Sequence, residues 1–318
     1  MEMENKIRIG VSACLLGQPV RFDGSHKHDR YLTNTLGEYL DFVPVCPEVE
    51  SGFSIPRETL RLVGDPEAPR LVTSRTNIDH TDRMLGWAEK RVRELESENL
   101  CGFIFKSDSP SSGLMRVKVY NPKGMAEKKG VGLFARTFIR HFPLLPVEEE
   151  GRLNDPVLRE TFIEQIFTLK RWRETLALGQ NMKNLVDFHT RHKLLMLSHS
   201  PANARLMGKL VADGRKTPIQ TVYAQYENLL IETLRMKSTI KKNLNVLEHI
   251  LGYFKNQLSS DEKQEMLEIF DRYRNEFLPL IVPVTLLNHY VRKIGEPYLK
   301  QQVYLNPHPI ALKLRNHA

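Results

Sequence analysis

Two cysteines of this chain stand where a strand-like run gives way to a turn. Cys14 lies in SACLLG, directly after the β-branched run IRIGV, and Cys46 lies in VCPE, directly after FVPV. A third turn, KSDSPSSG at residues 106–113, follows the apolar run CGFIF. In an open α/β sheet, ligand sites lie outside the carboxyl ends of the strands. The three turns can therefore converge on one crevice, although they are far apart in the sequence.

Thiols at such a crevice are open to several kinds of chemistry. Cys14 and Cys46 could form a redox pair, a mononuclear metal site or part of an iron–sulfur cluster. Their separation of 32 residues matches no compact zinc pattern such as CxxC, and an iron–sulfur cluster usually needs three or four thiolates. Cys101 opens the strand CGFIFK, so about 20 Å of extended chain separates it from the KSDSPSSG turn. We expect Cys101 in the core.

Polar side chains follow the same turns. Glu48 comes two residues after Cys46, and Asp23 lies in VRFDG. Asp23 can contact the crevice, or it can cap its own turn as an Asx residue. The KSDSPSSG turn is not a phosphate loop of the GxxxxGK[ST] type, and the chain has no GxSxG elbow of a serine hydrolase. GSHKHDR places His26 and His28 on a surface loop beside the crevice, where they can touch phosphate.

The elements that must position these residues alternate between strands and helices. Helical spacing is seen at residues 29–40, 80–99 and 130–143, between the strand-like runs. This alternation predicts an α/β N-terminal domain with a mainly parallel sheet. EEEGRLNDP (148–156) is interpreted as a polar connection. From Val157 onward the strand signals fade, so we expect an α/β domain at residues 1–160 and an all-α domain at residues 161–318, in which SSDE caps a helix start.

The charge of the chain is unevenly spread. Residues 1–165 hold 23 Lys and Arg against 25 Asp and Glu, whereas residues 166–318 hold 23 against 13, a net charge of +10. Such asymmetry is typical of a polyanion-binding module joined to a neutral one. The chain has no apolar run of about 18 residues, so no membrane span is expected. MEMENKIRIG is neither a signal nor a transit peptide, and the expected location is cytoplasmic.

The helical half contains the candidate RNA-binding residues. A basic helical surface can hold the phosphate backbone of a folded RNA by its shape. His189 and His192, three residues apart, are expected to be packed or to face RNA rather than to bind metal. Most of the tyrosines between the basic clusters are expected in the core. The basic side chains proposed to contact RNA are Arg191, Lys193, Lys241, Lys242, Arg292 and Lys293.

Three motifs carry a specific resemblance. SACLLGQPVRFDG (12–24), PVCPEVESGFSIPRE (44–58) and KSDSPSSG, in this order and spacing, resemble the TudS-like thiouracil desulfidase family over about residues 7–155. DFHTRHKLLMLSHSP, HILGYFK and QVYLNPHP resemble the YbgA-like helical domain. Chains that join both parts resemble the RudS type, which removes sulfur from 4-thiouridine in tRNA.

The resemblance implies a cofactor and a set of site residues. In that family three cysteines bind a [4Fe–4S] cluster and leave one iron open for the sulfur of the substrate. Carried over, the ligands are Cys14, Cys46 and a third residue in an SPSCG pattern, where this chain has Ser112 in place of cysteine. The acid/base and positioning residues map to Glu48 and Ser109. We therefore expect a weakened, labile or absent cluster in this chain.

The resemblance thus implies a desulfidase that replaces C=S by C=O without a change of oxidation state. The expected substrate and partner is tRNA that carries 4-thiouridine, held by the basic helical domain. Two alternatives stay open at this point. The chain could desulfurate free thiouracil or thiouridine nucleosides, or it could be a non-catalytic tRNA-binding protein that lost its cluster together with the third cysteine.

Overall fold

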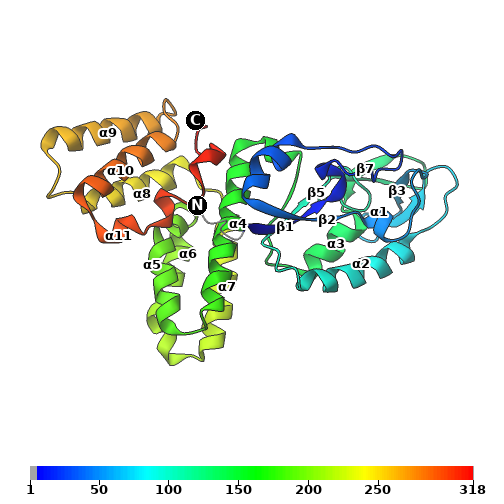
Figure 1. Ribbon diagram of the computed structural model, residues 1–318, viewed down its shortest axis with the longest axis horizontal. Coiled ribbons are helices and arrows are strands. Elements are labelled where there is room, and N and C mark those ends of the chain that lie inside the picture. Colours follow the sequence, from blue (N-terminus) through cyan, green and yellow to red (C-terminus); the bar gives the residue numbers. More distant parts are fainter. Residues whose placement is uncertain (1–5, 318) are drawn as a thin grey trace. The chain divides into compact units, whose positions relative to one another are not determined.

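A computed structural model describes residues 6–317 of the chain (Figure 1). The chain divides into two compact units, residues 1–155 and 156–318, each with its own core. The division falls a few residues before the expected boundary, at the start of a long helix. The expectation that the N-terminus is no targeting peptide concerns a segment whose residues 1–5 lie outside the described residues.

A parallel sheet forms the centre of the first unit. Its strands are β1 (Ile7–Ser12), β2 (Leu40–Val45), β5 (Phe103–Phe105) and β8 (Val147–Glu149), in the order β2-β1-β5-β8. All three pairings are parallel. The two central strands, β1 and β5, carry almost continuous buried apolar runs, as expected for strands covered on both faces. The turns after β1, β2 and β5 therefore leave the sheet at the same edge.

Helices and phenylalanines cover this sheet. The predicted amphipathic helix is present as α2 (Thr81–Glu96), with Met84, Ala88, Val92 and Leu95 buried. It packs against α3 (Leu133–His141). Four fully buried rings from β5 and α3 pack in one cluster, mostly edge to face, Phe103, Phe105, Phe134 and Phe138. This cluster fixes α3, and with it the turn that α3 supports, against the sheet.

A second sheet was not anticipated. Strands β3 (Leu60–Val63), β4 (Arg70–Thr73), β6 (Val117–Tyr120) and β7 (Ala126–Gly130) pair in the order β4-β3-β6-β7, with antiparallel pairs at both ends. The strands are short, and β7 reads AEKKG with four exposed residues. Strands of this length give no periodicity that the sequence alone reveals.

Two expectations within the first unit were wrong. The segment 148–156 is not simply a polar connection, because β8 is an edge strand of the parallel sheet that contains the buried residues Glu148 and Glu149. Glu149 accepts hydrogen bonds from the backbone N–H groups of Leu114 and Met115. Residues 31–38 form one π-helical and one 3₁₀ turn rather than a regular α-helix.

The second unit is mostly helical, and its described residues include no strand, so the predicted fold class is confirmed. Its core includes a stack of Trp172 with Tyr223 and Tyr226. The predicted cap is present as a capping box at Ser259 and Glu262. The helices are α4 (Pro156–Ala177), α5 (Met182–His199), α6 (Pro201–Asp213), α7 (Ile219–Arg235), α8 (Ile240–Tyr253), α9 (Ser260–Arg274), α10 (Ile281–Ile294) and α11 (Pro297–Lys300).

Candidate active site

A cavity of about 480 Å³ opens at the carboxyl edge of the parallel sheet. Residues from the turns after β1, β2 and β5 line it together, so the three turns do converge. Among the lining residues are the predicted site residues Cys14, Cys46, Glu48, Ser109 and Ser112. The parallel topology explains this, because strand ends distant in sequence meet at one sheet edge.

The two thiols sit on short turns directly after their strands. Cys14 lies in a 3₁₀ turn that ends at Gly17 in the left-handed conformation. Cys46 precedes α1 (Pro47–Glu50), and its Sγ lies 3.6 Å from Oε2 of Glu48. Burial, together with a smaller effect of the nearby Glu48 carboxylate, raises the pKa of Cys14 to about 11 and that of Cys46 to about 12. Both thiols are therefore protonated at neutral pH, and any metal that binds them must displace two protons.

Glu48 is linked to Ser109 through a third side chain, Ser111. Ser111 Oγ donates to Oε1 of Glu48 at 2.5 Å and lies 3.0 Å from Ser109 Oγ. Because the single hydroxyl proton of Ser111 points to the carboxylate, the hydroxyl of Ser109 must be the donor between the two serines. Ser109 Oγ in turn accepts from the backbone N–H groups of Ser111 and Ser112. The result is a directed chain from Ser109 through Ser111 to Glu48.

The N-terminus of α3 holds the turn that carries these serines. The backbone N–H of Gly132 donates to the carbonyl of Gly113 at 2.7 Å, and that of Phe134 donates to the carbonyl of Ser111 at 2.9 Å. The first helical N–H groups, which lack partners inside the helix, are thus satisfied by the turn. A Cβ atom on Gly132 would lie 2.4 Å from the carbonyl carbon of Ser111. Only glycine allows this approach.

An ion pair stands on another wall of the cavity. Lys106 Nζ lies 2.5 Å from Oε1 of Glu150, and the backbone N–H of Ser107 donates to Oε2 of Glu150 at 2.7 Å. The charge of Lys106 also lowers the pKa of Cys14, although less than burial raises it. Sequence reasoning singled out neither Ser111 nor Lys106. Both residues lie in KSDSPSSG, directly after a buried strand, and this position is the sequence signal that could have identified them.

The structure places two further residues, Cys101 and Asp23, outside the lining of the cavity. Cys101 is buried and does not line the cavity, as expected for a core residue. Asp23 does not line the cavity either. Its Oδ1 accepts from the backbone N–H and the hydroxyl of Ser25, so it caps its own turn. The structure therefore corrects the assignment of Asp23 as a catalytic contact.

Comparison with known proteins identifies both halves. Residues 9–150 match a family model described as 2-thiouracil desulfurase, and residues 193–309 match one described as Protein of unknown function (DUF1722). The chain is 30% identical to the uncharacterized protein YbgA of Escherichia coli (strain K12) over 153 residues, which is 48% of this chain and 90% of YbgA. The chain therefore belongs to the family of YbgA and carries a 2-thiouracil desulfurase domain.

Two further similarities concern smaller parts of the chain. The uncharacterized protein YbbK of Bacillus subtilis (strain 168) is 31% identical over 108 residues, which is 32% of this chain and 71% of YbbK. A solved structure of the [4Fe-4S]-dependent thiouracil desulfidase TudS is 30% identical, with a TM-score of 0.38, over 47% of this chain and 95% of that chain.

The desulfurase domain does not offer a complete set of cluster ligands. The cavity presents the thiols of Cys14 and Cys46 and the hydroxyl of Ser112, which is 3% exposed. Within residues 6–317, no group of three or more His, Cys, Asp and Glu side chains is placed to hold a metal ion. A serine alkoxide is a harder and far more basic ligand than a thiolate, so serine rarely replaces cysteine as a ligand at neutral pH. Because a [4Fe–4S] cluster needs three or four thiolates, the residues present do not fit it.

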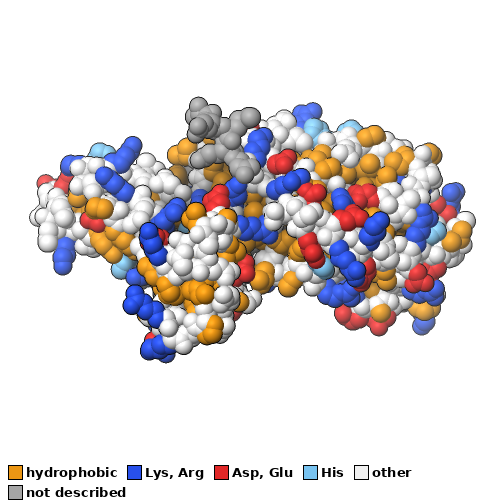
Figure 2. Space-filling model, turned by 60° about the horizontal axis from the view of Figure 1, so that its bottom comes forward, with side chains coloured by type: hydrophobic (Ala, Val, Ile, Leu, Met, Phe, Trp, Pro, Cys, Tyr) orange, Lys and Arg blue, Asp and Glu red, His pale blue; other side chains and the backbone are white. Residues whose placement is uncertain are grey.

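The candidate RNA-binding residues of the YbgA-like half differ in their availability. Arg191, Lys193, Lys241 and Arg292 are exposed. Lys293 is exposed but paired with Glu262. Lys242 is engaged internally, because its Nζ donates to the carbonyls of His199 and Lys237. On the face shown in Figure 2, Lys and Arg side chains are spread over the surface rather than gathered into one stripe.

The histidine pair of α5 does not face RNA. His189 and His192 are both buried, and His192 stacks on Phe188 with ring centroids 3.8 Å apart. The expectation of packed histidines is confirmed, and that of RNA-facing ones is wrong. Tyr223, Tyr226 and Tyr290 are buried as expected, whereas Tyr253 is exposed.

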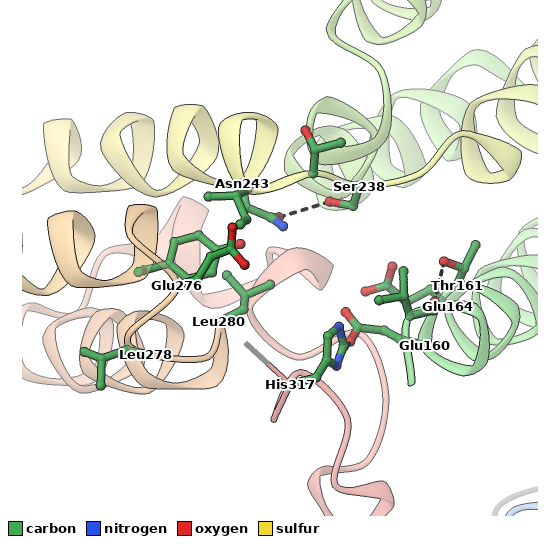
Figure 3. A pocket seen from close by; sticks show the side chains of 13 residues that line it. Glu160, Thr161, Glu164, Ser238, Asn243, Glu276, Leu278, Leu280 and His317 are labelled. Atoms are coloured by element: carbon green, nitrogen blue, oxygen red, sulfur yellow. Dashed lines mark hydrogen bonds and ion pairs between the residues drawn. The ribbon is translucent and has the colours of Figure 1, made fainter. Parts of the chain in front are cut away.

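A second cavity, of about 330 Å³, lies inside the helical unit (Figure 3). Glu160 and Glu164 of α4 project toward it. Glu164 is bound by Arg315 at 2.7 Å and by His199 at 3.0 Å, and Arg315 also pairs with Glu160. The charged side chains of this network pair with one another and attach the C-terminal segment to α4. They are therefore engaged in internal contacts rather than available to bind a ligand.

Proposed function

We propose that this chain belongs to the enzymes that desulfurate thiolated uridine, with 4-thiouridine in tRNA as substrate and with uridine and sulfide as products. One observation carries the proposal. Cys14, Cys46, Glu48 and Ser109, which come from three distant motifs, line one cavity of the 2-thiouracil desulfurase domain. A cytoplasmic location is part of this proposal, since tRNA is its partner. Within residues 6–317 no helix is long and apolar enough to cross a membrane.

The reaction requires a base and a positioned water molecule but no oxidant. Water adds to the thiocarbonyl carbon, the C–S bond breaks, and the sulfur leaves as sulfide, so that C=S and H₂O become C=O and H₂S. Glu48 is the group that can take a proton from the water. Ser111 fixes one carboxylate oxygen of Glu48 and leaves Oε2 directed toward the side of Cys46. The protein residues thus supply the orientation and the proton acceptor.

The decisive experiment concerns Ser112. The unaltered chain and the Ser112→Cys variant are reconstituted anaerobically with iron and sulfide, and iron, acid-labile sulfide and visible absorbance are measured. We expect the variant to take up about four irons per chain, in line with a three-thiolate site, and the unaltered chain to take up fewer. Loss of thiouridine absorbance in bulk tRNA then reports activity. Full loading of the unaltered chain, or no gain of activity in the variant, would refute the missing-ligand argument.

The helical half supports tRNA rather than a free base as the substrate. Residues 166–318, which make up most of this half, have a net charge of +10, and a positive charge of this size attracts a phosphate backbone. A uridine inside a folded tRNA must be exposed before its C4 atom can reach a cavity. We expect the rate of tRNA desulfuration to fall steeply as the salt concentration rises. Free thiouracil should remain unchanged. Equal rates on both substrates would favour a desulfidase of free thiouracil.

A non-catalytic alternative is favoured by Ser112 itself. If the third thiolate was lost without replacement, the chain would bind tRNA and leave 4-thiouridine intact. Salt-dependent tRNA binding without desulfuration, both before and after the Ser112→Cys change, would support this alternative.

A further inference from the structure

A third cavity, of about 570 Å³, lies in the helical unit between α10, α11 and the C-terminal segment 305–315. Small-ligand sites usually have volumes of roughly 300–1,000 Å³, so this cavity has room for a small molecule. Asn306 and His308, two of its lining residues, belong to the QVYLNPHP motif. The proposed function assigns no role to this motif.

Aliphatic side chains form the inner wall of the cavity. The buried apolar lining residues are Val284, Val291, Leu299, Leu305 and Leu314. Ile310, which also lines the cavity, is 80% exposed. A ligand that covers this wall and the side chain of Ile310 removes apolar surface from water, which favours its binding.

Hydrogen bonds between distant segments fix the walls of the cavity. Nδ2 of Asn288, on α10, donates to the carbonyl of Leu305 at 3.2 Å, and Nδ2 of Asn306 donates to Oδ1 of Asn288 at 3.4 Å. Nη1 of Arg315 donates to the carbonyl of Tyr304 at 2.7 Å. The cavity is therefore formed before any ligand enters, as ligand sites usually are.

The charged side chains that line the cavity have one sign. In the described part of the chain they are Arg292, Lys300 and Arg315, with no Asp or Glu among them. Arg315 is held by Glu160 and Glu164. Arg292 and Lys300 are exposed, and no ion pair or side-chain hydrogen bond is found for either within residues 6–317. Two uncommitted cations beside an apolar wall suit a ligand that is itself both apolar and negatively charged.

A further cation lies behind one wall. Nη2 of Arg171, on α4, donates to the carbonyl of Pro307, a buried lining residue. Nη1 of Arg171 is buried without a hydrogen bond, and no ion pair is found for this guanidinium in the described residues. Burial, together with smaller effects of the charges of Arg315 and Arg171, lowers the pKa of His308 to about 4, so His308 is neutral at pH 7. A buried cation without a carboxylate partner favours an anion nearby.

We propose that this cavity binds a small organic anion, whose apolar body packs on the aliphatic wall and whose phosphate or carboxylate group is contacted by Arg292 and Lys300. The charge of Arg171 behind the wall adds to the attraction. Arg292 is thereby assigned to a small-molecule site rather than to RNA. The inference goes beyond the proposed function and does not depend on it, because the ligand is neither tRNA nor a thiolated base.

The test measures binding to the full chain and needs no cluster. Phenyl phosphate, benzoate, benzyl alcohol and inorganic phosphate are titrated by calorimetry. We expect at least one aromatic anion to bind about tenfold or more tightly than benzyl alcohol, as for one charge-assisted hydrogen bond. The order of phenyl phosphate and benzoate shows which acid group the site prefers. Inorganic phosphate should bind more weakly than phenyl phosphate. Equal affinity for both aromatic anions and benzyl alcohol would overturn the site.

Matched variants locate the binding in this cavity. Arg292→Ala and Lys300→Ala should each weaken the aromatic anions by about tenfold and leave benzyl alcohol unchanged. Thr285→Trp, at an exposed lining position, should block all four probes by filling the mouth. Arg272→Ala, at an exposed position in the last turn of α9, is the control and should change nothing. Identical affinities in Arg292→Ala and Arg272→Ala, or full binding by Thr285→Trp, would refute the assignment.

A tRNA arm separates this site from the RNA contacts of the helical half. At matched ionic strength, saturating tRNA should leave the affinity for the preferred aromatic anion unchanged. Loss of anion binding in the presence of tRNA would assign the cavity to the RNA-binding surface and overturn the small-anion site. A chain that binds the anion but desulfurates nothing, even as Ser112→Cys, would overturn the proposed function alone.

Discussion

Ser111 shows how much one hydroxyl can decide at this site. Ser109 and Glu48, the two residues carried over from the family resemblance, do not contact each other directly in the hydrogen-bond network. Ser111 lies between them, is fully buried, and sets the direction in which a proton can move. A buried hydroxyl with both neighbours satisfied contributes orientation as well as about 1 kcal/mol of stability.

Removal of this hydroxyl should uncouple Ser109 from Glu48. In the Ser112→Cys background, we expect Ser111→Ala to lower the rate of desulfuration by about 10²-fold, the lower range for positioned acid/base groups. Iron content should stay unchanged, because Ser111 is no ligand. Ser97→Ala, at the exposed end of α2, is the control. An unchanged rate in Ser111→Ala would show that the chain through Ser111 is not used.

At the scale of elements, the site depends on a helix that contributes no reactive group. The first N–H groups of α3 bind the carbonyls of the 109–113 turn, and the phenylalanine cluster holds α3 on the sheet. The turn therefore gains its shape from the end of a helix about twenty residues further along the chain. Gly132 is the point of closest approach, with no space for a side chain.

Gly132→Ala should push the turn and the helix apart. We expect it to lower the free energy of unfolding of the first unit by about 1–3 kcal/mol, the usual cost of overpacking, and to reduce iron uptake in the Ser112→Cys background. Gly86→Ala, on the open face of α2, introduces a Cβ atom that meets nothing within 4 Å. That control should leave stability unchanged or raise it by up to about 1 kcal/mol. A urea midpoint for Gly132→Ala equal to that of Gly86→Ala would contradict the packing argument.

Across the whole molecule, buried histidines of the helical unit should make its stability depend on pH. The helical unit buries His189 and His192, and burial lowers the pKa of His189 to about 4 and that of His192 to about 3. Since an unfolded histidine titrates near 6.5, the unfolded chain takes up these protons first as the pH falls. The neutral histidines therefore cost no stability above about pH 6.5, and these two histidines lower the stability of the helical unit on acidification toward pH 4.

This loss can be measured by urea unfolding followed by Trp172 fluorescence in a Trp87→Phe background. Each buried histidine should contribute a slope of at most about 1.4 kcal/mol per pH unit. His192→Gln should remove one such contribution between pH 6.5 and 4, while His289→Gln, at an exposed position, should not. A slope in His192→Gln equal to that of the unaltered chain would show that His192 is not responsible.

The sequence by itself determined the elements with strong local signals. The apolar runs at β1, β2 and β5, the amphipathic pattern of α2 and the capping box at Ser259 are local features, and each appears in the structure. Motif identity also assigned Cys14, Cys46 and Ser112 to one site. These features depend on residue type and on spacing over a few turns, and both can be read directly from the sequence.

Only the tertiary structure decided which side chains act together. The second sheet and β8 arise from pairings between distant short segments, which leave no periodic trace. Asp23 accepts hydrogen bonds within its own loop, His192 is buried in the core, and Ser111 lies between Ser109 and Glu48. Asp23 bonds to Ser25 within its own turn, an outcome that the local Asx pattern allowed. The contact between Ser111 and Glu48, by contrast, joins residues 63 positions apart. Such contacts are set by how the sheet edge and the helices pack, so no local pattern could specify them.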